Sequence, residues 1–329
     1  MRFKLFLKRV IGIIVLLITL FNIGLYGCSN DNENQPFPII NEFCVYYLDV
    51  GEGDCIFINL PDGKRMIIDT GLYSNDNYNK LKNLLTSYSV NKIDYLVLTH
   101  PDADHIGNAF SIIQDYTVEK AFVPDVYNKQ LYTEFNGVFN LLIEKGCQIT
   151  YPSVYTYIEG EEYYIAFLSP NYTESIGYYS YFNALEQPNS EQVNNLSPII
   201  YLEYKGVTFL FTGDANYKQE QIFIEYKKIG LFNFIHKPIN LDDIDFLKVG
   251  HHGAEDCTSE EFIYAINPQN AVISVGGNNI YGHPSTKTIS RLCNQYINVN
   301  VLRTDVCGTI AVGVNQSGEY AIYKQSDYS

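Results

Sequence analysis

Four side chains able to bind a metal lie in one short segment. His100, Asp102, Asp104 and His105 fall within six consecutive residues of a chain that has only 6 histidines. Four ionisable groups this close repel one another unless a bound cation compensates. A polar helix start capped by Asp102 or Asp104 is disfavoured, because residues 93–99 form an apolar β-type run that ends in a turn. Imidazole nitrogen and carboxylate oxygen suit zinc, with manganese or iron as alternatives.

Three further polar clusters each follow an apolar segment of β type. Asp214 follows the run FLFTG, His251 and His252 follow FLKVG, and His283 follows ISVGG after a short loop. Five of the 6 histidines therefore lie at predicted strand ends. Polar groups at the ends of neighbouring strands meet at one edge of a sheet, so these clusters are candidates for one site.

The elements expected around these clusters form two successive halves, each with strands followed by helices. Three strands with a hairpin turn at 61–64 are predicted within 43–71, and helices at 77–90, 106–116 and 127–146. Residues 171–194 are the least regular stretch and a candidate surface loop. A second hairpin is expected within 197–216, and the residues from Thr258 to Glu261 have the pattern of a helix capping box. This rhythm predicts an α+β protein with two sheets packed face to face and helices outside.

The N-terminus has the layout of a secretory signal. Residues 1–28 carry four basic side chains and no acids, with an apolar run from Val10. The segment Leu25–Cys28 resembles a bacterial lipobox, which implies cleavage before Cys28 and lipidation of that cysteine. An uncleaved membrane anchor is the alternative, because the apolar run is just long enough to span a bilayer. Residues 29–41 form a polar linker. Both the lipoprotein and the uncleaved anchor place the domain that follows this linker outside the cytoplasm and attached to a membrane.

The net charge limits which partners the chain can attract, and the cysteine content limits which disulfides it can form. The formal charge of −15 excludes attraction of nucleic acid over the whole surface. A polyanionic substrate must therefore be attracted by metal cations and a local basic patch. Of the 7 cysteines, six remain if Cys28 is lipidated, and their spacing defines no disulfide framework. Disulfides and small buried hydrophobic side chains both remain open for them.

Taken together, these motifs resemble the metallo-β-lactamase superfamily. The order His-x-Asp-x-Asp-His, a later strand-end Asp and a final His-Gly carries the likeness. The segments LDVGEGDCIFI, IIDTG, THPDADHIGN, FLFTGDA, LKVGHHG and YGHP are more closely similar to the hydrolase domain of ComEC competence proteins. The likeness covers about 44–312 and lacks the membrane channel of that family. It implies an αββα four-layer sandwich and one hydrolase domain over 42–325.

The resemblance also implies two divalent metal ions, zinc with manganese as the alternative. The ligands it implies are His100, Asp102, Asp104, His105, Asp214 and His252. Asp214 would bridge the two ions, and exchange of the roles of His251 and His252 remains open. Asp102 stands where most of the superfamily has His, and no His occurs between His105 and His236. The first metal site is therefore expected to be rich in oxygen ligands.

Further roles follow from the positions beside these ligands. His251 and His283 are candidates for proton transfer or charge neutralisation, and equally for hydrogen bonds that orient a ligand. Candidates for substrate contacts are Asn195, Asn279 and Tyr281. Asp49, Asp54 and Asp69 are expected to hold turns or to orient ligands rather than to bind metal.

The expected function is a membrane-tethered, extracytoplasmic dinuclear metal hydrolase, a phosphodiesterase or nuclease of ComEC type that acts on nucleic acid, with DNA as the candidate substrate. One alternative keeps the hydrolase and changes its substrate to a thioester, a lactone, a lactam or a phosphorylated surface polymer. The other is a non-catalytic binding subunit of a DNA-uptake or surface complex. The full ligand set argues against this last alternative.

Overall fold

The computed structural model describes residues 37–126, 131–170, 178–234, 236–294 and 299–328. Within it, Phe37–Asp327 form one compact unit. Cys28 and the rest of the predicted signal segment lie outside the described residues. None of the helices in the described ranges has both the length and the apolar character needed to span a membrane.

The first sheet has eight strands in the order β15-β14-β1-β2-β3-β4-β5-β6. Its antiparallel part consists of consecutive strands at each end of the chain, β1 to β3 and β14 to β15, joined by the pair β1–β14, and β3, β4, β5 and β6 run parallel to one another. The strands are β1 (Phe43–Tyr47), β2 (Ile56–Asn59), β3 (Arg65–Ile68), β4 (Lys92–Val97), β5 (Thr117–Phe122), β6 (Gln148–Thr150), β14 (Ile310–Val314) and β15 (Tyr320–Lys324).

The second sheet has seven strands in the order β13-β12-β11-β10-β9-β8-β7. Strands β10 to β13 are parallel, and β7 to β10 are antiparallel. The strands are β7 (Tyr157–Glu159), β8 (Tyr163–Phe167), β9 (Ile200–Tyr204), β10 (Val207–Phe211), β11 (Phe246–Lys248), β12 (Asn270–Ile273) and β13 (Asn300–Arg303).

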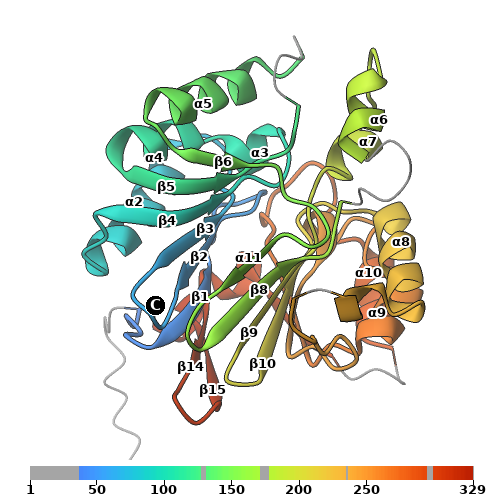
Figure 1. Ribbon diagram of the computed structural model, residues 1–329. Coiled ribbons are helices and arrows are strands. Elements are labelled where there is room, and N and C mark those ends of the chain that lie inside the picture. Colours follow the sequence, from blue (N-terminus) through green and yellow to red (C-terminus); the bar gives the residue numbers. More distant parts are fainter. Residues whose placement is uncertain (1–36, 127–130, 171–177, 235, 295–298, 329) are drawn as a thin grey trace, which may run out of the picture. The chain divides into compact units, whose positions relative to one another are not determined.

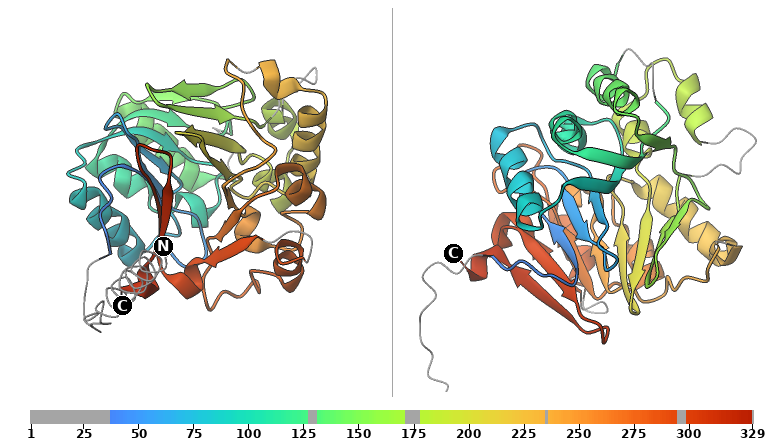
Figure 2. Two further views of the ribbon diagram at one scale, coloured as in Figure 1. Left: turned by 90° about the horizontal axis from the view of Figure 1, so that it is seen from below. Right: turned by 60° about the vertical axis from the view of Figure 1, so that its left-hand side comes forward.

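Helices cover the outer face of each sheet, and the two inner faces pack against each other (Figure 1 and Figure 2). The first sheet is covered by α2 (Asn75–Ser87), α3 (Ala103–Ile106), α4 (Ala109–Asp115) and α5 (Thr133–Glu144). The second is covered by α8 (Tyr217–Lys228), α9 (Glu260–Ile266) and α10 (Thr286–Leu292). The remaining α-helices of the described residues are α6 (Tyr178–Ala184), α7 (Ser190–Asn194) and α11 (Thr304–Cys307). The predicted αββα sandwich is confirmed.

The alternation of side chains along β1 shows how one strand serves two hydrophobic layers. Phe43, Val45 and Tyr47 point into the layer between the sheets. Cys44 and Tyr46 point into the layer under α2, α4 and α5. Successive strand residues face opposite sides of a sheet, so a strand buried on both faces reads as a continuous apolar run.

Two local expectations differ from the structure. Residues 178–184 and 190–194, expected as loop, form α6 and α7. In α7 the Asn189 side chain accepts from the Gln192 N–H while the Gln192 side chain accepts from the Asn189 N–H, a capping box in a polar sequence. The cap of α9 is Ser259 rather than Thr258, because the Thr258 hydroxyl instead accepts from the Gly250 N–H.

The described cysteines form no disulfide. Cys44, Cys55, Cys257 and Cys307 are buried, so the reading as small hydrophobic side chains holds for these four.

Candidate metal centre

The segment His100–His105 joins β4 to α3 at the edge where several parallel strands end. His100 and His105 are completely buried, whereas Asp102 and Asp104 keep 43% and 30% of their side chains exposed. Asp102 is the N-cap residue of α3, but its side chain makes no capping hydrogen bond. The Asp102 carboxylate therefore does not cap the helix and remains available to bind a metal ion.

Asp214, at the end of β10, lies among four histidines. Its carboxylate oxygens lie 3.3 Å from His105 Nε2, 3.8 Å from His100 Nε2, and 3.7 Å from both His251 Nε2 and His252 Nε2. Histidines from β4 and from β11, far apart in the sequence, thus meet around one carboxylate. The predicted strand-end clusters converge on this position.

Of the four groups of side chains in the described residues that could hold a cation, two lie next to Asp214 and have His105 in common. One consists of His100, His105 and Asp214, and the other of Asp104, His105 and His252. In the second group, His252 Nε2 lies 3.3 Å from Asp104 Oδ2.

The buried polar atoms that face this centre have no hydrogen-bond partner among the described residues. They are His100 Nε2, His105 Nε2, His252 Nε2 and Asp214 Oδ1. An unsatisfied buried polar group costs about 1–3 kcal/mol, so four such atoms converging on one point fit bound cations rather than a structural role.

The opposite nitrogen of each buried histidine is held from behind. His105 Nδ1 contacts Asp69 Oδ2 at 2.8 Å, and His252 Nδ1 donates to the Ser274 carbonyl oxygen at 2.9 Å. His100 Nδ1 lies 3.0 Å from the Thr99 hydroxyl oxygen. Hydrogen bonds at Nδ1 fix the tautomer and turn the Nε2 lone pair toward the centre.

The electrostatic environment holds His100 and Asp214 in forms that can bind a cation. Burial lowers the pKa of His100 to about 3, so its imidazole is neutral near pH 7. Burial alone would raise the pKa of Asp214, but His105 and His252 hold that pKa well below its usual range. Neutral imidazole and ionised carboxylate are the protonation states that metal ligands require. At His105 and His252 burial is outweighed by nearby carboxylates, chiefly Asp214, which raise the pKa of His252 and raise that of His105 well above its usual value, so both imidazoles must lose a proton when a cation binds.

The adjacent residues His251 and His252 point in different directions. Both have positive φ, 45° and 52°, and their rings are 67° apart in plane. His252 is buried against Asp104, whereas 27% of the His251 side chain is exposed. His251 Nδ1 lies 3.4 Å from Asn194 Nδ2. The geometry therefore favours His252 as the ligand and places His251 at the mouth of the centre.

His283 lies at the same mouth, on the loop after β12. Its ring centroid is 5.4 Å from that of His251 and 6.3 Å from that of His252. Tyr281 is largely exposed and stacks on His283 with ring centroids 5.7 Å apart. Asn279 bonds the backbone of His283 and Gly276, so it holds the loop rather than presenting a free side chain.

The structure does not support Asn195 as a substrate contact. Its side chain is buried, and its Oδ1 accepts from the Asn216 N–H at 3.3 Å. The neighbouring Asn194 lies against His251 instead. The sequence NNLS offers two adjacent amides, and only the end of α7 at Asn194 decides which of them faces the centre.

Several supporting residues gave no local signal in the sequence. Asp69 orients His105 as expected, but the partner of Asp54 is Lys248, buried at the end of β11. Glu52 contacts His283. A lysine inside the apolar run DFLKVG was the one available hint, since a fully buried lysine requires a partner.

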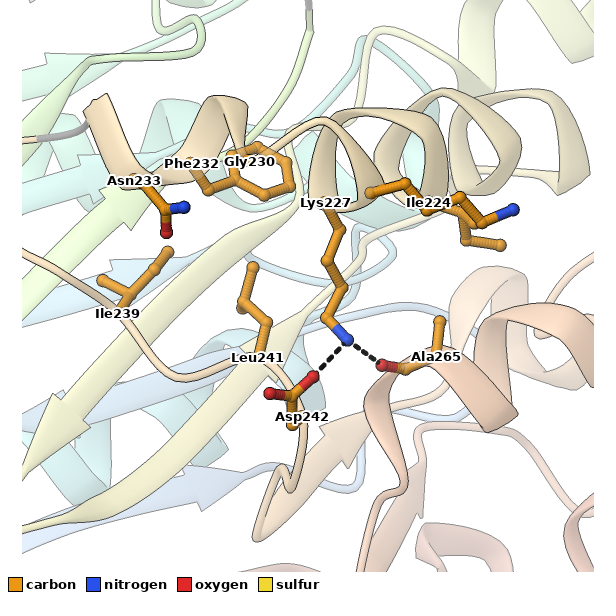
Figure 3. Close-up of a pocket in the computed structure, with 10 residues that line it drawn as sticks. Ile224, Lys227, Gly230, Phe232, Asn233, Ile239, Leu241, Asp242 and Ala265 are labelled. Carbon is orange, nitrogen blue, oxygen red and sulfur yellow. Dashed lines mark hydrogen bonds and ion pairs between the residues drawn. The ribbon is translucent and has the colours of Figure 1, made fainter.

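A separate cavity of about 370 Å³ lies beside the C-terminal end of α8 (Figure 3). Ile224, Phe232 and Leu241 supply its apolar lining, and Lys227 pairs with Asp242 at its wall. It shares no residue with the groups around Asp214.

Comparisons with known proteins agree with this geometry. Residues 48–168 match the family described as the metallo-beta-lactamase superfamily. The chain is 30% identical over 298 residues to ComE operon protein 3 of Bacillus subtilis (strain 168), covering 86% of this chain and 34% of that one. It is 25% identical over 278 residues to competence protein ComA of Neisseria gonorrhoeae, covering 84% and 33%. The chain thus spans about a third of the length of these relatives.

Among solved structures, CmlA, a diiron β-hydroxylase from Streptomyces venezuelae, superposes with a TM-score of 0.50 at 14% identity. The superposition covers 85% of this chain and 55% of that one. At this identity the similarity concerns the fold alone.

Proposed function

The chain belongs to the metallo-β-lactamase superfamily, and from this premise we propose that it is a metal-dependent phosphodiesterase that acts on nucleic acid. The observation that carries the proposal is the set of buried, unpartnered atoms on His100, His105, His252 and Asp214. The fold family implies divalent metals, and these atoms fit them.

The proposed ligands are those that the family resemblance implies, and the distances between them support the set. His100, Asp102 and Asp214 would hold one ion, and Asp104, His105, His252 and Asp214 the other. Three imidazoles and three carboxylates form a mixed nitrogen and oxygen set, which suits zinc and also accepts manganese. CmlA holds two irons on the same fold, so iron belongs in the metal analysis.

Divalent cations at such a site supply activated water near neutral pH and neutralise charge on the phosphate oxygens. The chain's own residues supply the rest. His251, with its exposed edge beside Asp214, is placed to donate a hydrogen bond to a non-bridging phosphate oxygen. His283 is placed to give a proton to the leaving oxygen.

Two observations bear on the substrate, and they point in opposite directions. The competence-protein relatives favour nucleic acid. The formal charge of −15 opposes a long polyanion. A smaller substrate, such as a thioester, a lactone or a lactam, is therefore the second candidate.

The proposed setting is extracytoplasmic attachment to a membrane through the N-terminus. The support is the order of a basic start, an apolar run and the segment LYGC that ends at Cys28.

The test is metal analysis of the full chain, run beside hydrolysis of single-stranded DNA, RNA, bis-p-nitrophenyl phosphate, nitrocefin and a thioester. We expect about two metal ions per chain and hydrolysis of the diesters. The Asp214→Ala variant should lose both properties. Hydrolysis of nitrocefin or the thioester alone would replace the proposed substrate class, and a metal-free wild-type chain would contradict the proposed enzyme.

A further inference from the structure

A tight turn between β1 and β2 carries Glu52 to the mouth of the metal centre. Both neighbours of Glu52 are glycines with positive φ, 74° at Gly51 and 134° at Gly53. A Cβ on Gly53 would collide with the Asp104 carbonyl oxygen. The next residue, Asp54, donates its N–H to that same oxygen at 3.2 Å. The turn is therefore seated directly on the segment that holds the metal ligands.

Both carboxylate oxygens of Glu52 are engaged by the loop after β12. Oε1 lies 2.7 Å from His283 Nδ1, and Oε2 accepts from the Gly276 N–H at 3.1 Å. Only 12% of the Glu52 side chain and 13% of the His283 side chain are exposed. The pair thus connects the first half of the sandwich to the second beside the metal centre, at a position that is largely shielded from solvent.

The backbone of His283 is fixed independently of Glu52. Asn279 accepts from the His283 N–H at 2.9 Å and donates to the His283 carbonyl oxygen at 2.7 Å. Because Asn279 already holds the His283 backbone, the contact with Glu52 acts on the imidazole ring alone and turns its Nδ1 edge toward the carboxylate.

An ionised carboxylate can only accept, so the Nδ1 of His283 must be the donor in this pair. The proton on Nδ1 is then held by Glu52, and Nε2 is the nitrogen left to exchange protons. No hydrogen bond to Nε2 of His283 is found among the described residues.

We propose that Glu52 is a positioning residue that keeps the Nδ1 proton on His283, so that Nε2 delivers its proton to the leaving group. The inference rests on the proposed phosphodiesterase activity. In the step, a water-derived hydroxide oxygen forms a bond to phosphorus while the bond between phosphorus and the leaving oxygen breaks. The leaving oxygen keeps the electron pair of that bond and takes the Nε2 proton of a His283 ring that begins protonated on both nitrogens. His283 is left neutral, with its remaining proton on Nδ1 hydrogen-bonded to Glu52.

The competing explanation is that Glu52 only ties two loops together. The Glu52→Gln variant separates the two, because its amide has the same size and can still accept from Gly276. A glutamine can either accept from Nδ1 or donate to it, so it no longer dictates where the proton resides. The matched control is Glu162→Gln, which removes a carboxylate from an exposed pair with Lys205.

The first measurement compares two diesters that differ in the leaving group, bis-p-nitrophenyl phosphate and diphenyl phosphate. A poorer leaving group depends more on protonation. We expect Glu52→Gln to lose at least tenfold more turnover on diphenyl phosphate than on bis-p-nitrophenyl phosphate, with metal content equal to wild type. The Glu162→Gln control should keep the wild-type ratio between the substrates. Equal losses on both diesters would overturn the proton-delivery role.

The second measurement requires no activity. Nitrogen-15 NMR of the histidine rings reports the tautomer, and the His283 signals are identified by their loss in His283→Asn. In spectra of the neutral ring, the form left after proton delivery, wild type should carry its single proton on Nδ1, and Glu52→Gln should show a mixture of tautomers. An unchanged tautomer in Glu52→Gln would overturn the positioning role. If the tautomer changes as expected while wild type hydrolyses no diester, the proposed function fails and the proton-delivery step fails with it.

Discussion

Lys248 and Asp54 form a completely buried ion pair behind the metal centre, with Nζ 2.5 Å from Oδ2. The other oxygen of Asp54 lies 3.6 Å from His252 Nδ1, and the lysine also donates to the Gly213 carbonyl oxygen at 3.4 Å. The pair therefore links the strand that carries His252 to the turn that precedes Asp214. It also neutralises a carboxylate that lies beside His105 and His252, two of the proposed metal ligands.

Removing this lysine should destabilise the fold severely. Lys248→Met leaves Asp54 buried and unpaired, and breaking a buried pair costs about 3–5 kcal/mol. Urea unfolding of the metal-free chain measures the free energy of unfolding. The control is Lys287→Met, which breaks an exposed pair with Glu255 and should cost under about 1 kcal/mol. A similar decrease in the free energy of unfolding in both variants would show that the buried pair contributes no more to stability than the exposed pair.

Asp214 should be indispensable to both metal positions. Among the residues that the structure describes, Asp214 is the carboxylate that lies close to His100, His105 and His252 alike, and Asp214→Ala removes it. We expect metal content to fall from about two ions toward zero, and diester turnover to fall with it. Asp242→Ala is the matched control, since Asp242 pairs only with the surface residue Lys227 among the described contacts. Two retained ions and a full rate in Asp214→Ala would show that the centre has been misassigned.

Asp102 should affect one metal position more than the other. It lies 3.7 Å from His100 Nε2 and is distant enough from His252 that no contact between them is found in the described residues. Asp102→Ala should lower stoichiometry toward one ion. Asp102→His should tighten zinc at that position and weaken manganese, because imidazole suits zinc better. Competition with a chromophoric chelator measures both affinities, and an unchanged zinc affinity in the two variants would exclude Asp102 as a ligand.

The N-terminal prediction concerns residues outside the described structure. Cys28→Ser should abolish incorporation of a labelled fatty acid and leave the precursor at its uncleaved size. Gel mobility and membrane fractionation provide the measurement. Unchanged attachment and mobility would favour the simple uncleaved anchor over the lipoprotein.

The convergence of distant polar clusters could be predicted because each cluster follows a strand. His100 follows β4 of the first sheet, and Asp214 and His252 follow the parallel strands β10 and β11 of the second, so these residues meet where the carboxyl ends of the strands of both sheets lie at one edge of the sandwich. Hydrophobic periodicity was enough for this step, since both sheets are buried on two faces and read as apolar runs.

Pairs joined only by the tertiary fold could not be predicted. Glu52 and His283 are separated by 231 positions, and no local sequence pattern around either residue indicates that the two are in contact. Lys248 lies on β11 of the second sheet, and its charge can be buried because Asp54, which precedes β2 of the first sheet, pairs with it. The choice between Asn194 and Asn195 depends on how α7 is oriented, because consecutive helical residues point about 100° apart, and the composition of NNLS does not encode that orientation.

The final prediction concerns the carboxylate that supports His105. Asp69 is completely buried and accepts from the Thr99 N–H at 2.8 Å, from the Thr99 hydroxyl at 2.6 Å, and lies 2.8 Å from His105 Nδ1. In Asp69→Asn an amide N–H can face Nδ1, which would move the ring proton to Nε2, the nitrogen proposed to bind metal. Loss of such a supporting group typically costs about 10–100-fold in metal affinity.

Zinc affinity measured by chelator competition tests this, with Asp94→Asn as the control. Asp94 is also largely buried, and it accepts from the Arg65 N–H at 2.8 Å without touching the histidines in the described structure. Asp69→Asn should bind zinc at least about tenfold more weakly than Asp94→Asn, with both variants folded by circular dichroism. Equal zinc affinity in the two variants would mean that His105 does not depend on Asp69 for its tautomer, and that its orientation is set by packing alone.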